Sequence, residues 1–524
     1  MAWLAGTVAV AVVLFTSYLL QSRTVSVGSD GASSALQAWE MVHGNPLLRG
    51  WWVSDVSLYT TELPQYMLIV AVRGLSADVM HVAGAMTYTL LVLLAAFLAR
   101  GRARGRAGLV RALLAGGIML APQLGTGTNT LMLSPEHVGT SVAVLAVLLL
   151  VDLAPRRWWV PVLAGLALTW IMVADELVAI IAAVPLALVC AIRVNQGAIT
   201  RRAGWSAPTG KTGWSAPTGN RGWRAQWYEL SLAVAAVMSI PAGLAGVALI
   251  KALGGWQIGT LHTHLAGRAA LATNVRLTGQ GLLELFGADP FGAGSGRAVV
   301  FAVAHLIGVV MVAWGFGLAV RRFLRRDGII ESVLVIAIVL NVIAYLTVIT
   351  ATNILSTSEI TAVLPFGAVL AGRLLGERVL AARAGLAMGV VLAGYAAMLG
   401  FSAVQPAAAP LYVNLTAYLR AHHLTSGISG YAEANIVTAQ SGGAVSLRPV
   451  DGKGRYLTAR KWEASTAWYD PATQRADFLV LATAGAYRVS SQAALATFGP
   501  PVRTYRYRGY TIMVWNENLF AHLR

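Results

Sequence analysis

The side chains of this chain that could carry chemistry are acidic residues and histidines at the ends of apolar segments. The first is Asp30, in SVGSDGASSALQAWEMVHGN, just after an apolar run. Ala32, Leu36, Trp39 and Val42 recur behind it at three- and four-residue steps, which predicts an amphipathic helix on a membrane surface. Taken alone, the carboxylate is best interpreted as a cap of the helix N-terminus, which contributes ~1 kcal/mol. A chemical role for it stays open.

Two further acidic sites follow the same pattern. Glu136 and His137 stand side by side in GTGTNTLMLSPEHVGT, and Asp175 and Glu176 separate two apolar runs. A carboxylate and an imidazole can both bind a divalent cation. The Ser-Pro-Glu sequence is also a good helix start, with proline in the first turn. Carboxylates flanked by apolar helices are costly in a membrane, which favours a functional role.

The stretch LHTHLAGR and the residues after it supply cationic candidates, namely His262, His264, Arg268 and Arg276. Two histidines without a third ligand are a weak metal site. The arginines could bind a phosphate group through their planar donors or contact ordinary lipid headgroups. Asp55, Asp175, Glu176 and Glu359 are secondary candidates.

The composition identifies the setting of these residues. The chain has 524 residues, of which 57% are hydrophobic and 12% charged, and its mean hydropathy is +0.65. A soluble protein would have roughly twice that charged fraction. Apolar runs long enough to cross a ~30 Å hydrocarbon core recur along the chain, so we expect a polytopic membrane protein. The net charge of +17 comes largely from arginines in short loops, which favours a topological role over a nucleic-acid partner.

We expect an all-α membrane domain over residues 1–404 with about eleven spans. The expected spans are 3–20, 79–98, 108–123, 135–152, 158–174, 176–193, 228–250, 298–320, 329–350, 359–375 and 385–404. With a cytoplasmic N-terminus, every loop on the cytoplasmic side is basic, which predicts this orientation in the plasma membrane.

The long connections are expected to have distinct roles. The outside loops are 21–78, with a second surface helix over 64–74, and 251–297. The cytoplasmic segment 194–227 contains GWSAPTG twice and is expected to be a flexible linker.

After residue 404 the long apolar runs end. The shorter helical and strand patterns over 405–524 predict a small extracytoplasmic α/β domain. Helical spacing covers 411–423, and SQAALATFG reads as a short helix that ends on Gly499. ADFLVLAT, VRTYRYR and YTIMVWN read as strands, with a turn at Gly509. The aromatic residues Tyr431, Trp462, Trp468 and Tyr469 could stack on a sugar, although core packing is the preferred interpretation.

The order of these features resembles the polytopic glycosyltransferases of the GT-C type, such as the protein O-mannosyltransferases and the bacterial lipid A aminoarabinose transferases. The arginine-rich composition suits a GC-rich, actinobacterial genome. The matching stretches are SDGASSALQAWEMVHGN, ELPQYMLIVAVRGL, TYTLLVLLAAFLARGRARG, LSPEHVGT and LHTHLAGR. The chain has Glu136 where the family usually has aspartate. In NILSTSEITAVLP it has Ser358 and Glu359 where many members have a basic residue or tyrosine.

The resemblance implies transfer of a sugar from a polyprenyl-phosphate donor to an extracytoplasmic acceptor, which would be a cell-envelope glycan, lipid or protein. Asp30 would be the general base. Glu136 with His137 would hold a divalent metal, Mg²⁺ or Mn²⁺. Arg268 or Arg276, with His262 and His264 nearby, would neutralise the lipid phosphate.

Two other functions remain open on the sequence. A non-catalytic scaffold or pseudoenzyme could present the C-terminal domain. A lipid or small-molecule transporter would also be polytopic. Such folds often consist of two repeated halves, and we find no such symmetry between the halves of this membrane domain.

Overall fold

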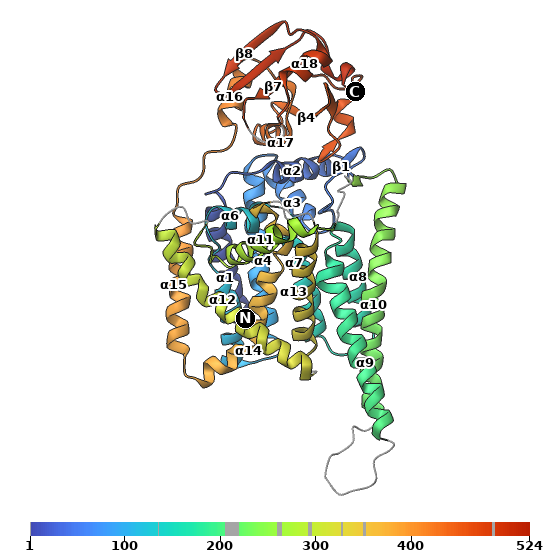
Figure 1. Ribbon diagram of the computed structural model, residues 1–524, viewed down its shortest axis with the longest axis vertical. Coiled ribbons are helices and arrows are strands. Elements are labelled where there is room, and N and C mark those ends of the chain that lie inside the picture. The colour runs from blue at the N-terminus through green and yellow to red at the C-terminus, as the bar shows by residue number, and fades with distance from the viewer. Residues whose placement is uncertain are drawn as a thin grey trace.

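The computed structural model describes residues 2–134, 136–204, 219–258, 265–291, 296–325, 328–348, 353–484 and 488–523. Long helices form a membrane domain, and the C-terminal domain sits at one end of it (Figure 1). We call this end, which carries helices α2, α3 and α11, the C-domain end. The turn between α14 and α15 lies at the opposite end of the bundle.

Each expected span contains a helix. These helices are α1 (Ala2–Ser22), α4 (Asp78–Arg100), α5 (Gly105–Ile118), α7 (Val138–Leu153), α8 (Trp159–Ala174), α9 (Val184–Gly204), α10 (Gly219–Ala252), α12 (Gly296–Arg325), α13 (Ile329–Thr347), α14 (Val363–Ala381) and α15 (Gly385–Ala403). Within the described residues, six of them are long and apolar enough to cross a membrane: α1, α4, α10, α12, α13 and α15. The number rises to eight if two bent pairs each count as one span.

The two bent pairs differ from straight spans because the chain breaks before the long helix begins. In the first, α6 (Thr126–Thr128) and the π-helical turn η1 (Asn129–Leu133) meet α7 at 60°. In the second, the 3₁₀ helix η3 (Ile354–Ile360) meets α14 at 53°. Another π-helical turn, η2 (Ala179–Ala183), precedes α9. Breaks of this kind release backbone and side chains from the regular helix and often mark functional sites.

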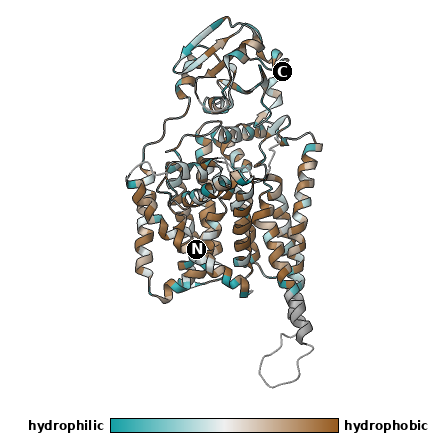
Figure 2. Ribbon diagram, in the orientation of Figure 1, coloured by the Kyte–Doolittle hydropathy of each residue, from teal (hydrophilic) through white to brown (hydrophobic). Residues whose placement is uncertain are grey.

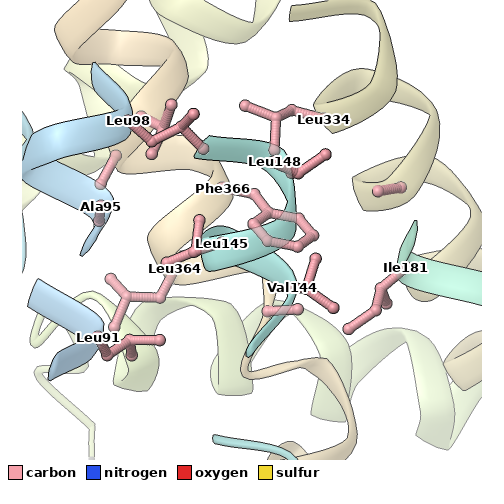
Figure 3. Packing of buried hydrophobic residues seen from close by; sticks show 14 of the residues in the cluster. Leu91, Ala95, Leu98, Val144, Leu145, Leu148, Ile181, Leu334, Leu364 and Phe366 are labelled. Carbon is pink, nitrogen blue, oxygen red and sulfur yellow. The ribbon is translucent and has the colours of Figure 1, made fainter. Parts of the chain in front are cut away.

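Apolar side chains fill the inside of the membrane domain and also cover its lateral surface. Figure 2 shows hydrophobic residues along the long helices. Inside the bundle, Leu98 of α4, Leu145 of α7 and Phe366 of α14 belong to one buried cluster (Figure 3). Valine and leucine side chains of α1, such as Val8, remain exposed, as expected of a surface that faces lipid. The fold class expected for this domain is confirmed.

Short helices lie across the C-domain end. They are α2 (Ser29–Val42), α3 (Leu63–Arg73) and α11 (Arg268–Leu285). The first two match the surface helices expected after Asp30 and over 64–74. Asp30 is not the cap of α2, because Gly28 occupies that position without a side-chain hydrogen bond and Asp30 lies in the first turn.

The C-terminal domain contains a six-stranded mixed sheet in the order β5-β4-β3-β7-β9-β8. Its strands are β3 (Ser426–Ser429), β4 (Ser446–Lys453), β5 (Tyr456–Ala459), β7 (Phe478–Ala482), β8 (Arg503–Tyr507) and β9 (Tyr510–Val514). The accompanying helices are α16 (Val413–Ala421), α17 (Tyr431–Gln440) and α18 (Ser491–Phe498), with short 3₁₀ helices η4 (Thr466–Tyr469) and η5 (Leu519–His522). Strands β8 and β9 pair antiparallel around Gly509, whose φ of 83° suits glycine.

A second, three-stranded sheet joins the two domains. It pairs β1 (Trp51–Val53) with β2 (Gln257–Ile258) on one side and with β6 (Ala464–Ser465) on the other. Glu40 of α2 reinforces this junction, since its carboxylate accepts hydrogen bonds from Trp51 Nε1 at 2.6 Å and Trp468 Nε1 at 2.9 Å. A buried cluster runs across the same boundary, so the C-terminal domain packs directly on the membrane domain.

Helices extend into both ends of the expected cytoplasmic linker 194–227. Helix α9 runs into it as far as Gly204, and α10 begins at Gly219. The central part, 205–218, holds most of the GWSAPTG repeat and lies outside the described residues.

Candidate functional site

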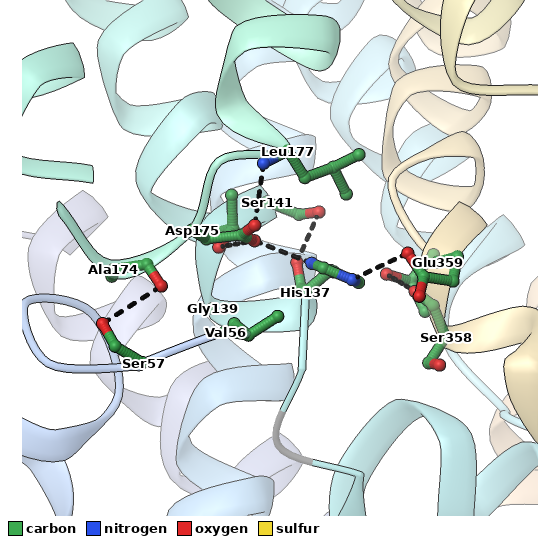
Figure 4. Close-up of polar contacts among 12 residues, drawn as sticks. Val56, Ser57, His137, Gly139, Ser141, Ala174, Asp175, Leu177, Ser358 and Glu359 are labelled. Atoms are coloured by element: carbon green, nitrogen blue, oxygen red, sulfur yellow. Dashed lines mark hydrogen bonds and ion pairs between the residues drawn. The ribbon is translucent and has the colours of Figure 1, made fainter. Parts of the chain in front are cut away.

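His137 lies at the centre of a buried polar group at the C-domain end (Figure 4). Its Nδ1 is 2.7 Å from Asp175 Oδ2. The same carboxylate accepts a hydrogen bond from Thr140 Oγ1 at 2.6 Å, and its other oxygen accepts from the backbone N–H of Leu177 at 2.8 Å. His137 and Asp175 are 4% and 2% exposed. Asp175 is therefore a buried carboxylate whose hydrogen bonds are largely satisfied, as a buried charge requires.

The second nitrogen of His137 faces another carboxylate. Its Nε2 is 3.1 Å from Glu359 Oε2, on the 3₁₀ helix η3 (Figure 4). An imidazole between two carboxylates donates from both nitrogens when it is protonated. His137 thus links three breaks in the helical bundle: the one before α7, the one after α8 and the one before α14.

The start of α7 is hydrogen-bonded to the start of the surface helix α3. The backbone N–H of Gly139 donates to Glu62 Oε1 at 2.8 Å, and Glu62 precedes α3. Burial raises the pKa of Glu62 to about 7. Ser141 Oγ donates to the His137 carbonyl at 3.0 Å. Backbone groups freed by the break are thus paired again by side chains, as buried backbone requires.

A cavity of about 730 Å³ opens beside this polar group. Asp55, His137, Asp175 and Glu359 form part of its wall, and apolar residues of α10 and α13, such as Leu244 and Ala344, form another part. Its size is within the usual range for small-molecule sites. A cavity whose wall combines carboxylates with aliphatic side chains suits a ligand with a polar head and an apolar tail.

Lys251 also lines this cavity, at the end of α10, and brings a positive charge to it. The sequence analysis did not select it. A signal was present, because Lys251 is one of few lysines in an arginine-rich chain and follows the expected span 228–250 at its outside end.

Asp30 is exposed and contacts the C-terminal domain. Its Oδ1 accepts a hydrogen bond from the Tyr431 hydroxyl at 2.5 Å, and its carboxyl also pairs with Glu463. Desolvation by the surrounding protein raises the pKa of Asp30, while the bond with Glu463 and the charge of Arg460 oppose this. The sequence could not predict that Tyr431 and Glu463 contact Asp30, because each is more than 400 positions away from it along the chain.

The carboxylates of Asp30, Asp55 and Glu136 lie close enough to Glu463 to act on it electrostatically. Burial raises the pKa of Glu463 well above its ordinary value, and these three negative charges raise it further. Of these carboxylates, Asp55 lines the cavity. The side chain of Glu136 bonds to that of Ser358, which stands next to Glu359, the partner of His137, on η3.

The remaining predicted residues are placed as follows. Glu176 is exposed and lines the cavity. Arg268 and Arg276 lie on α11 and are exposed, and neither is part of the described cavity wall. Asn274 of the same helix bonds to the carbonyls of Leu346 and Val348. His262 and His264 lie outside the described residues.

The expected metal pair does not form a ligand set. Both ring nitrogens of His137 already face carboxylates, so neither is free to bind a cation in this arrangement. Over the ranges that the structure describes, no three His, Cys, Asp or Glu side chains group as ligands. We therefore give no step of the chemistry to a metal ion.

No protein-family profile matches the chain, and no curated protein does. Solved structures of the oligosaccharyltransferase from Archaeoglobus fulgidus are similar. The complex with zinc and sulfate has 14% identity and a TM-score of 0.48 over 90% of this chain and 67% of that chain. The form tethered to an acceptor peptide has 13% identity and a TM-score of 0.46, over 92% of this chain and 70% of that chain. The complex with an inhibitory peptide and a dolichol-phosphate has 12% identity and a TM-score of 0.44, over 90% of this chain and 69% of that chain. This likeness assigns no role to any residue.

Proposed function

We propose that this chain is a membrane glycosyltransferase that transfers a sugar from a polyprenyl-phosphate donor to an extracytoplasmic acceptor. The observation that carries the proposal is the 730 Å³ cavity. It combines carboxylates, a lysine and an aliphatic wall at the C-domain end of the membrane domain. A polyprenyl-phosphate sugar has a polar sugar, an anionic phosphate and a long apolar chain, and each part has a matching surface there.

In the proposed complex, the prenyl chain lies along the aliphatic wall formed by α10 and α13. The phosphate lies near Lys251, whose ammonium group neutralises its charge. The sugar faces Asp55 and Glu359, which accept hydrogen bonds from its hydroxyl groups. Arg268 and Arg276 would then meet lipid headgroups or the phosphate from α11, at the edge of the site.

Asp30 acts in this proposal as the general base. The acceptor hydroxyl loses its proton to Asp30, and its oxygen forms a bond to the anomeric carbon of the sugar. The bond from that carbon to the phosphate oxygen breaks, and the phosphate keeps the electron pair. Lys251 stabilises the negative charge that develops there. Inversion at the sugar carbon is what the resemblance to the GT-C glycosyltransferases implies.

The proposal is tested with purified protein in nanodiscs and a panel of polyprenyl-phosphate sugars that carry a radiolabelled sugar. Asp30→Asn should bind the donor normally and lower kcat at least ~100-fold, as expected for loss of a general base. Lys251→Gln should weaken donor binding ~10- to 100-fold, as expected for loss of a bond to a charged group. Lys453→Gln is the matched control, because Lys453 is exposed on β4 of the C-terminal domain.

The same panel is measured with and without Mg²⁺ or Mn²⁺, and with Glu136→Gln, to test the metal that the resemblance implies. Failure of the wild type to bind any donor, with all variants folded, would contradict the proposal. A scaffold that presents the C-terminal domain would then be the better explanation, and Asp30 would serve the contact with Tyr431 alone.

A further inference from the structure

The C-terminal domain reaches the candidate base directly. We propose that Glu463 is a positioning residue that keeps a proton and, through the Tyr431 hydroxyl, holds Asp30 as the ionised proton acceptor. The active site is then composite, with its base on the membrane domain and its supporting acid on the C-terminal domain. The catalytic part of this inference rests on the proposed function, whereas the protonation of Glu463 does not.

The contacts require an additional proton. The Tyr431 hydroxyl is 2.5 Å from Asp30 Oδ1 and is also hydrogen-bonded to Glu463 Oε2. A hydroxyl group has one proton to donate, so it cannot donate to two ionised carboxylates at once. The arrangement is complete when one carboxyl is protonated and donates to the Tyr431 oxygen or to the other carboxyl, with which it is also in contact, while the ionised carboxyl accepts the Tyr431 proton.

The surroundings decide which carboxyl holds the proton. Glu463 is 5% exposed, whereas Asp30 is exposed. Desolvation raises the pKa of both carboxyls, and it places that of Glu463 well above its ordinary value. The Arg460 guanidinium lies 4.1 Å from the centre of the Tyr431 ring, and its charge favours the ionised form of Asp30. Glu463 therefore keeps the proton and Asp30 the charge.

The backbone of Glu463 is fixed by its surroundings, which positions the side chain beside Tyr431 and Asp30. Glu463 is a non-glycine residue at φ 49°, a left-handed conformation that persists only where the surrounding structure enforces it. The next residue, Ala464, begins β6 and pairs with Trp52 of β1. Ser33 of α2 and Asn435 of α17 both donate to the Glu463 carbonyl, at 3.4 and 3.3 Å.

Tyr431 is fixed in the same way. The Ser29 hydroxyl donates to the Tyr431 carbonyl at 2.5 Å, and Tyr431 begins α17, which packs on α2. Both helices therefore present their first turns to each other, with Asp30 on one side and Tyr431 on the other. The titratable or charged groups that face Glu463 from all sides are Asp30, Asp55, Glu136, Tyr431 and Arg460.

The first experiment measures protonation without any substrate. Infrared spectra of wild type, Glu463→Gln and Glu433→Gln are recorded in nanodiscs between pH 5 and 9. The wild type should show a protonated carboxyl band above neutral pH that is absent in Glu463→Gln and moves in Tyr431→Phe. Glu433 is a buried carboxyl of α17 with a raised pKa, so its removal should delete a different band that Tyr431→Phe leaves in place. If Glu463→Gln deletes no band, the inference is overturned whatever the enzyme does.

The second experiment measures transfer across pH. In Glu463→Gln the introduced amide would donate to Tyr431 at every pH, so this variant should keep kcat within about threefold at neutral pH and lose the fall in kcat on the alkaline side. Glu463→Ala and Tyr431→Phe should lower kcat at least tenfold with donor KM unchanged. Equal losses in Glu463→Gln and Glu463→Ala at all pH values would show a structural role only. If the wild type transfers no sugar but the infrared result holds, the proposed function fails while the protonation of Glu463 stands.

Discussion

Glu136 and His137 are adjacent in sequence and both contact the 3₁₀ helix η3, but only His137 also contacts Asp175. His137 joins Asp175 and Glu359, whereas Glu136 bonds to Ser358. The sequence identified both as chemically important because they stand beside an apolar span. It could not show their directions, because the partners of His137 lie 38 and 222 positions away. A shared metal ion was the simplest prediction for neighbours of these types, and the contacts of His137 leave no nitrogen for it.

Glu62 gives a pH-dependent prediction at the same scale. Its pKa is raised from 4.5 to about 7 by burial, so the folded state favours the neutral acid. The resulting stabilisation is complete below pH 4.5 and is lost as pH rises through 7. Glu62→Gln should remove this loss, because the amide oxygen still accepts from Gly139. The variant should be more stable than wild type by about 3 kcal/mol at pH 8 and equal at pH 4.

Thermal unfolding in detergent at a series of pH values measures this difference. Glu176→Gln is the control, since Glu176 is an exposed carboxyl near the same cavity. A constant difference between wild type and Glu62→Gln from pH 4 to 8 would contradict the assignment.

At the scale of elements, the site depends on helices that break. The spans predicted over 135–152 and 359–375 overlap α7 and α14, but apolar runs show length and not the path of the backbone before a helix. The structure has η1 before α7 and η3 before α14, and these breaks turn His137 and Glu359 toward each other. Periodicity located the long helices, the surface helices and three strands of the C-terminal domain. Short strands such as β1 and β6 have no pattern of their own, because each is formed by pairing with a distant segment.

The position of η1 depends on a close approach by α4. A Cβ atom built on Gly84 would overlap the Met132 carbonyl. Gly84→Ala should therefore displace η1 and lower stability by about 1–3 kcal/mol, with loss of donor binding. Gly116→Ala on α5 is the matched control, since its Cβ would be 3.8 Å from the nearest atom, Ala96 Cβ. That variant should be neutral or slightly stabilised.

Melting temperatures and donor binding of both variants test the prediction. Equal behaviour of Gly84→Ala and Gly116→Ala would show that the contact between α4 and η1 does not position the site.

At the scale of the whole molecule, the C-terminal domain and the cavity lie at the same end of the helical bundle. The fold class followed from composition, and the change in pattern predicts a division near residue 404. The packing of the two domains could not be predicted, because it depends on contacts such as those of Glu40 with Trp51 and Trp468. Taken one at a time in the sequence, Glu40, Trp51 and Trp468 have no feature that indicates a contact between domains.

The proposed orientation places the C-terminal domain outside the cell. Gln492 of α18 and Ala382 after α14 are exposed, while the native Cys190 is buried. In intact cells, Gln492→Cys should react with a membrane-impermeant maleimide, and Ala382→Cys should react only after permeabilisation. The parent protein, with Cys190 alone, should stay unlabelled. Labelling of Ala382→Cys in intact cells would reverse the orientation.

The contact between Tyr431 and Asp30 spans 401 positions of the chain, which has a consequence for biosynthesis. A nascent chain emerges from its N-terminus at ~5–20 residues per second. Asp30 therefore leaves the ribosome among the first residues, whereas Glu463 follows only after the membrane helices have been made. The base acquires its final partners at the end of synthesis, so a partly made chain with an inserted membrane domain still has an incomplete site.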